Sequence, residues 1–202
     1  MLKTLSQAVR IVLLLNLAYF FVEFAVAVSI GSVSLFADSV DFLEDASINL
    51  LILIGLGWST RARARLGMLL AVVLLVPGLA ALWTGYQKIL DPVPPSVIPL
   101  SAAGAGAFLV NLTCAFILVR FRRHSGSLTR AAYLSARNDV LANLAIILAG
   151  GVTAFYPTPW PDLVVGLGIA VMNLDAAREV YQEARAEHAS GADDPTDGQP
   201  RP

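Results

Sequence analysis

The chain has 202 residues, of which 56% are hydrophobic and only 14% are charged, and its mean hydropathy is +0.68. This composition is far more apolar than that of an average soluble domain, so an ordinary soluble protein is excluded. The net charge of −1 points to no partner, and the single cysteine, Cys114, excludes an internal disulfide. We therefore expect a multi-pass integral membrane protein.

Apolar runs long enough to cross a membrane recur along the chain. A hydrocarbon core of about 30 Å requires about 20 apolar residues per helix. Such runs lie at 9–30, 33–57, 66–87, 97–120, 131–155 and 161–181. The first run is longer than the apolar part of a signal peptide and lacks a small-residue cleavage site, so we interpret it as a membrane helix.

Short loops connect these runs, which predicts one all-α domain over residues 1–187, a six-transmembrane-helix bundle. The last residues, 188–202, are rich in Gly, Pro, Asp and Ala and have no apolar periodicity. We expect a disordered tail there.

The positive charges predict how the bundle is oriented. Arginines fill the connections "STRARARLG" and "RFRRHSGSLTR", whereas the connections of the other side contain only Lys88. Lys and Arg accumulate in short cytoplasmic loops. Both termini and the tail are therefore expected in the cytoplasm, with the protein in the cell (inner) membrane.

The second run contains four carboxylates. At about 100° per residue, Asp38, Asp41, Asp45 and Asn49 fall within an arc of about 80°, and Glu44 lies on its flank. A central Asp costs about 2.5 to 3.5 kcal/mol on membrane insertion, so this stripe must face protein, water or a cation. Helix capping near the interface is an alternative role for Asp38.

The fifth run carries a matching polar face. Ser135 and Asp139 lie one turn apart on that face, with Asn138 and Asn143 on its flanks. Carboxylate, amide and hydroxyl oxygens are ligands of divalent cations. The two helices therefore predict a divalent-cation site between them.

Three other charged residues in the apolar runs have open roles. Arg137 either extends toward the cytoplasmic boundary or pairs with Glu44, because Glu44 immediately precedes Asp45 and Arg137 comes two residues before Asp139. Glu23 in the first run is either part of a proton path or a structural group, and the sequence favours neither.

The segment "NLAYFFVEFAVAVSIGSVSLFADSVDFLEDASINL" resembles the first two helices of the cation diffusion facilitator (cation efflux) family. It contains that family's Ser-Leu and Ala-Asp elements and its D/H-x-x-x-D pattern. "YQKILDPVPPS" is similar to the link between helices three and four, "LTRAAYLSARNDVLANLAIILAG" to the fifth helix and "WPDLVVGLGIAVMNLDAAREVYQEA" to the sixth. The resemblance covers about residues 9–187.

The resemblance implies a metal transporter, usually a homodimer, that exchanges cytoplasmic Zn, Mn, Fe or Co for protons. It places Asp41 and Asp45 at two ligand positions. The fifth helix of the family usually carries His or Asp where this chain has Ser135, followed by Asp139. The chain also lacks the cytoplasmic domain that many members append, so we expect a short form.

The candidate cation ligands are Asp41, Asp45, Asp139, Ser135, Asn138 and Asp38. Ser135 is the expected fourth ligand, and Asn138 or Asp38 replaces it if Ser135 does not face the cation. Oxygen-only ligation favours Mn, Fe, Co or Mg, whereas family frequency favours Zn, so the metal stays open. Crowded carboxylates retain protons until a cation displaces them, which predicts antiport.

Two alternatives remain. A transport-inactive relative could serve as a metal-binding or assembly partner, an interpretation favoured by Ser135. A membrane enzyme ranks lowest, since no nucleophile, His base or cofactor loop accompanies the acids. We expect no enzyme activity, no prosthetic group and no nucleic-acid partner; the expected partners are the lipid bilayer, divalent cations, protons and a second copy of the chain.

Overall fold

The computed structural model describes residues 4–54, 79–121 and 127–172, together with Arg65, Leu69 and Val72; for 127–134 it describes the backbone only. Its helices include α1 (Leu5–Ile30), α2 (Val33–Ile54), α4 (Val97–Leu118) and α5 (Ser127–Phe155). Residues 79–90 and Trp160–Met172 are also helical. Because no strand occurs in these described ranges, the predicted all-α class is confirmed.

The helix bounds follow the apolar runs with small shifts. α1 begins four residues before the predicted 9, because the Thr4 hydroxyl caps its first turn by accepting from the Gln7 N–H. α5 likewise begins at Ser127 rather than 131, so the helix extends into the basic connection. Most of 55–78, all of 173–181 and the predicted tail 188–202 lie outside the described residues.

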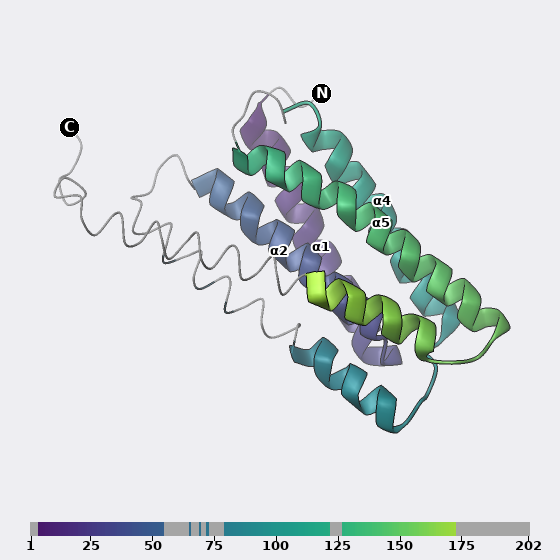
Figure 1. Cartoon of the computed structure of the whole chain (residues 1–202). Coiled ribbons are helices and arrows are strands. Elements are labelled where there is room, and N and C mark those ends of the chain that lie inside the picture. The colour runs from purple at the N-terminus through teal and green to yellow at the C-terminus, as the bar shows by residue number, and fades with distance from the viewer. Residues whose placement is uncertain are drawn as a thin grey trace, which may run out of the picture.

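The long helices form a bundle (Figure 1). α1 packs along α2 and α4 along α5, and the two pairs meet through α1 with α4 and α2 with α5. α2 is buried along most of its length, whereas α1, α4 and α5 each expose an apolar face. The helix that carries the acids is therefore the one that its neighbours shield from lipid.

The outward faces of the other helices are apolar. Phe21, Leu109, Phe116 and Leu148 are all more than half exposed. α1, α4 and residues Ser135–Phe155 are long and apolar enough to cross a membrane. The chain is thus a multi-pass integral membrane protein with an all-α bundle, as predicted.

Small residues allow the helices to approach closely. A Cβ atom on Gly106 would overlap the Tyr19 side chain, and one on Gly150 would overlap that of Ser101. The Tyr19 hydroxyl donates to the Ala103 carbonyl at 2.6 Å. Glycines in α4 and α5 therefore make room for side chains of the neighbouring helices and allow close packing, as is common in membrane bundles.

The interior has a polar layer between two apolar clusters. One cluster contains Ala27, Leu35, Phe36, Ala37, Ala81, Leu100, Ala103, Ile146 and Ile169. The other contains Val12, Cys114, Ala115, Leu118 and Ala136. Along α1, α4 and α5, the buried acids and amides lie between the positions that belong to these clusters, and on α2 the acids follow Leu35, Phe36 and Ala37 of the first cluster. The apolar clusters therefore enclose the polar layer at both ends.

Candidate functional site

The polar stripe predicted on the second run is buried on α2. Asp38 has no exposed surface, Asp45 is 2% exposed and Asp41 is 9% exposed. Asn49 lies on the same stripe, but its amide donates to the Asp45 carbonyl at 2.7 Å, one turn earlier. The amide nitrogen of Asn49 is thus engaged within the helix, whereas its Oδ1 is buried without a hydrogen-bond partner among the described residues. The three aspartates supply the carboxylates of the stripe.

The matching face of α5 meets this stripe. Asp139 is 9% exposed and interacts electrostatically with Asp41 and Asp45. Ser135, which is half-buried, forms a side-chain hydrogen bond with the Asp45 carboxylate. The structure therefore brings together four of the predicted residues, Asp41, Asp45, Asp139 and Ser135, from two helices that are far apart in sequence.

Asp38 is tied to a separate chain of amides. Its Oδ2 accepts a hydrogen bond of 2.6 Å from the Asn143 amide, whose oxygen accepts one of 3.0 Å from Asn111 of α4. No amide or hydroxyl of the described residues bonds to the other oxygen, Oδ1, and the Asp38 carboxyl also forms a side-chain hydrogen bond with the buried Glu23 carboxyl of α1. Asp38 therefore anchors α2 to α4 and α5 with one oxygen and presents the other to the polar layer.

Asn138 does not lie with these residues. Its side chain is exposed, and its carbonyl oxygen lies 3.5 Å from the Arg137 guanidinium. Arg137 is itself exposed and forms no ion pair with Glu44, which is 7% exposed. The structure therefore favours an Arg137 side chain that extends toward the cytoplasmic boundary of the membrane over one that pairs with Glu44.

Two residues outside the predicted set contact the acids. The side-chain amide nitrogen of Asn16 donates to Asp45 Oδ2 at 3.4 Å, and the Cys114 thiol donates to the side-chain oxygen of Asn16, Oδ1, at 3.5 Å. All three side chains are buried. The sequence signal for Asn16 was an amide in an otherwise apolar run, because a buried amide requires a polar partner.

The carboxylates lack the partners that a buried charge requires. Among the described residues, Asp45 Oδ1 and Asp139 Oδ2 are buried without a hydrogen-bond partner, and the fully buried Glu23 carboxyl has only another acid, Asp38, as its hydrogen-bond partner. Among the described side chains, the groups that donate to these acids are neutral amides and hydroxyls. An unpaired buried carboxylate costs several kcal/mol, so the layer must take up protons or a cation.

The acids are near one another without forming a closed metal centre. In the part of the chain that the structure describes, no three His, Cys, Asp or Glu side chains are arranged as a metal site. A cation between α2 and α5 would therefore need small side-chain shifts or further oxygen ligands, such as the Ser135 hydroxyl. Flexible oxygen ligation of this kind suits divalent ions.

Comparison with known proteins agrees with this arrangement. Residues 9–187 match the model of the cation efflux transmembrane domain. The cation-efflux pump FieF of Salmonella typhi is 29% identical over 169 residues, which cover 76% of this chain and 55% of the relative. FieF of Escherichia coli K12 is 31% identical over 173 residues, covering 76% of this chain and 56% of the relative.

The chain thus spans little more than half the length of these curated relatives. The family match nevertheless extends over most of the chain and includes every helix that positions the acids. The chain belongs to the cation efflux family.

Proposed function

We propose that this protein is a divalent-cation/proton antiporter that exports Zn, Mn, Fe or Co from the cytoplasm. The observation that supports this most is the group of buried carboxylates on α2 and α5. Among the described residues, some of their oxygens have no hydrogen-bond partner, and the donors that do contact them are neutral. The matched relatives are cation-efflux pumps, which favours the same conclusion.

Asp41, Asp45 and Asp139 are the proposed cation ligands, and Ser135 is the fourth. Each of the aspartates is at least nine-tenths buried, and their charges interact across the α2–α5 contact. Asp38 is less suited because the Asn143 amide holds it at 2.6 Å, much closer than the 3.4 Å from Asn16 to Asp45, and because Glu23 also bonds to it. Asn138 is less suited because it is exposed. All these ligands are oxygen atoms, so the metal identity stays open among the four.

Exchange follows from the electrostatics of this group. Carboxylates close together in a medium of low dielectric repel one another, so without a metal cation they bind protons. A divalent cation must displace them in order to bind. A site that opens alternately to each side therefore carries cations outward and protons inward, and the uptake of protons drives the export.

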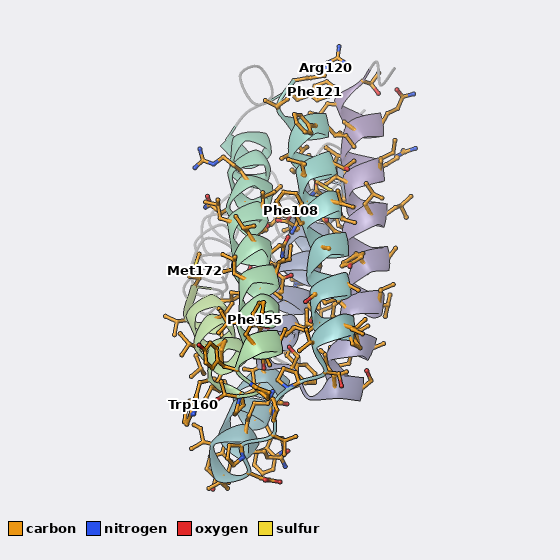
Figure 2. All side chains as sticks on the ribbon, turned by 90° about the vertical axis from the view of Figure 1, so that its right-hand side faces the viewer. Phe108, Arg120, Phe121, Phe155, Trp160 and Met172 are labelled. Atoms are coloured by element: carbon orange, nitrogen blue, oxygen red, sulfur yellow. The ribbon has the colours of Figure 1, made fainter. Side chains whose placement is uncertain are left out.

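We propose that the bundle lies in the inner membrane with both termini in the cytoplasm. Arg120 lies at one end of the bundle and Trp160 at the other (Figure 2). The turn between α1 and α2, at the Trp160 end, contains no Lys or Arg. A homodimer is proposed on the family resemblance alone.

The direct test is cation-driven proton movement in liposomes. The purified protein would be reconstituted with a pH-sensitive dye inside and exposed to Zn, Mn, Fe, Co or Mg. We expect at least one cation to change the internal pH, and Asp45→Asn to remove that response at equal protein content. Asp91→Asn is the matched control, because Asp91 is an exposed carboxylate outside the polar layer. A silent wild-type protein that still binds a cation would contradict the antiport proposal.

A further inference from the structure

A buried carboxylate outside the polar layer, Asp162, lies at the Trp160 end of the bundle. Asp162 has no exposed surface and accepts five hydrogen bonds. Its Oδ1 accepts from the Ser32 hydroxyl at 2.6 Å, the Ser34 N–H at 3.2 Å and the Ser34 hydroxyl at 2.6 Å. Its Oδ2 accepts from the Val33 N–H at 2.9 Å and the Lys88 ammonium at 2.8 Å.

These bonds cap the helix that carries the acids. The N–H groups of Val33 and Ser34 belong to the first turn of α2, where no earlier carbonyl of the helix can accept them. Caps usually come from the residue just before the helix, and Ser32 does accept the Leu35 N–H at 3.2 Å. Here a carboxylate more than a hundred residues away adds the negative charge that a helix N-terminus favours.

Lys88 connects a third segment to the same point. Its ammonium donates to Asp162 and also to the Gly31 carbonyl at 2.6 Å, and its side chain is 6% exposed. Gly31 forms the turn between α1 and α2 with a φ of 62°, which favours glycine. The turn is therefore fixed to helical residues 79–90 as well as to Trp160–Met172.

Backbone packing reinforces this junction. A Cβ atom on Gly166 would lie 2.6 Å from the Ser34 nitrogen and 2.6 Å from the Val33 carbonyl carbon. Only glycine lets the helix Trp160–Met172 touch the start of α2 so closely. The first turn of α2 thus has a fixed axial position and rotation relative to helical residues 79–90 and to Trp160–Met172.

The rotation of α2 decides where its acids point. Asp41 follows Val33 by eight residues, about 12 Å along a rigid helix, so a rotation at the first turn is carried to Asp41 and Asp45. We propose that Asp162, held by Lys88, is a positioning residue that sets the height and rotation of α2 and so aims its acids at Asp139. This inference rests on the proposed cation site.

The test compares cation affinity in folded protein. Asp162→Asn removes the negative charge and puts an amide N–H₂ group, itself a donor, next to the N–H, hydroxyl and ammonium groups that donate to Asp162. We therefore expect the Kd for Mn or Zn to rise about tenfold in the monodisperse fraction. Lys88→Met leaves four of the five bonds to Asp162 and should raise the Kd by less. Asp91→Asn, an exposed carboxylate at the same end, is the control and should leave the Kd unchanged.

A charge swap separates positioning from simple pairing. Lys88→Asp combined with Asp162→Lys restores an ion pair, but a lysine cannot accept the N–H groups of Val33 and Ser34. We expect the swap to leave the Kd weakened. Recovery of the wild-type Kd in the swap, or a wild-type Kd in folded Asp162→Asn, would overturn the proposal.

Two further measurements cover the other outcomes. If Asp162→Asn does not fold, Ser32→Ala with Ser34→Ala removes two side-chain donors to Asp162 and should still weaken the Kd. If wild-type protein binds no cation, the proposed function fails by itself. Spin labels at Ile54 of α2 and Leu141 of α5, in a Cys114→Ala background, then report the helix placement directly. Asp162→Asn should broaden that distance distribution, and an unchanged distribution would refute the positioning role.

Discussion

The buried acids of the polar layer and the buried Asp162 differ in how their charges are matched. At the Trp160 end, Asp162 has an ammonium, two backbone N–H groups and two hydroxyls around its oxygens. In the polar layer, Asp45 and Asp139 each keep a buried oxygen without a hydrogen-bond partner in the described part of the chain. A carboxylate whose oxygens are all hydrogen-bonded is suited to stabilise the fold. A carboxylate with an unpartnered buried oxygen needs a proton or a cation to neutralise it.

The largest expected effects concern transport. Asp41→Asn, Asp45→Asn and Asp139→Asn should each reduce cation-dependent proton exchange in liposomes to the level of protein-free vesicles, because each removes an anionic ligand. Asp38→Asn should keep measurable exchange, since Asn143 holds Asp38 at 2.6 Å and Glu23 also bonds to it, whereas Asn16 lies 3.4 Å from Asp45. Equal loss in all four variants would erase the distinction between Asp38 and the other three.

The next contrast is stability. Asp162→Asn should lower the free energy of unfolding by about 3 kcal/mol, because it leaves the buried Lys88 ammonium without its counter-charge. Asp139→Asn should change it by less than about 1 kcal/mol, since its carboxylate has no ion pair to lose among the described residues. Denaturant titrations of both variants in detergent measure the difference. A similar loss in both would contradict the comparison.

The amide chain gives an intermediate effect. Asn143→Leu removes the donor to Asp38 and the acceptor for Asn111, and we expect a loss of about 1 to 3 kcal/mol in stability. The same denaturant titration detects this loss. Thr113→Val is a suitable control, because the Thr113 hydroxyl bonds only to a carbonyl of its own helix and is exposed.

Metal preference should respond to Ser135. Ser135→His places an imidazole one turn before Asp139, and nitrogen with oxygen ligation favours Zn over Mn. We expect the Zn-to-Mn affinity ratio to rise by about tenfold in competition titrations. An unchanged ratio would mean that Ser135 does not face the cation, and Asp38 would become the favoured fourth ligand.

The smallest effect should come from Arg137 and Glu44. Because Arg137 is exposed and bonded to Asn138, a double-mutant cycle with Arg137→Ala and Glu44→Gln should give a coupling below about 0.5 kcal/mol. Stability measured for the two single variants and the double variant provides the cycle. A clearly larger coupling would restore the ion-pair interpretation.

The sequence predicted the α2 stripe and its α5 counterpart because helical spacing places residues on one face without knowledge of the neighbours. It also predicted the bounds of α2 and α4 to within a few residues, since apolar length decides them. The contacts between Asn16 and Asp45 and between Lys88 and Asp162 depend on which helices become neighbours. Helical periodicity carries no information about those neighbours, so both contacts were missed.

The central claim is that Asp41, Asp45 and Asp139 exchange protons for a divalent cation. Its most direct test is isothermal titration of the purified protein with the preferred cation in two buffers of different ionisation enthalpy, which counts protons released per cation bound. We predict a release of about two protons for wild type and fewer for Asp139→Asn. Identical heats in both buffers, with cation bound and no proton released, would contradict the account.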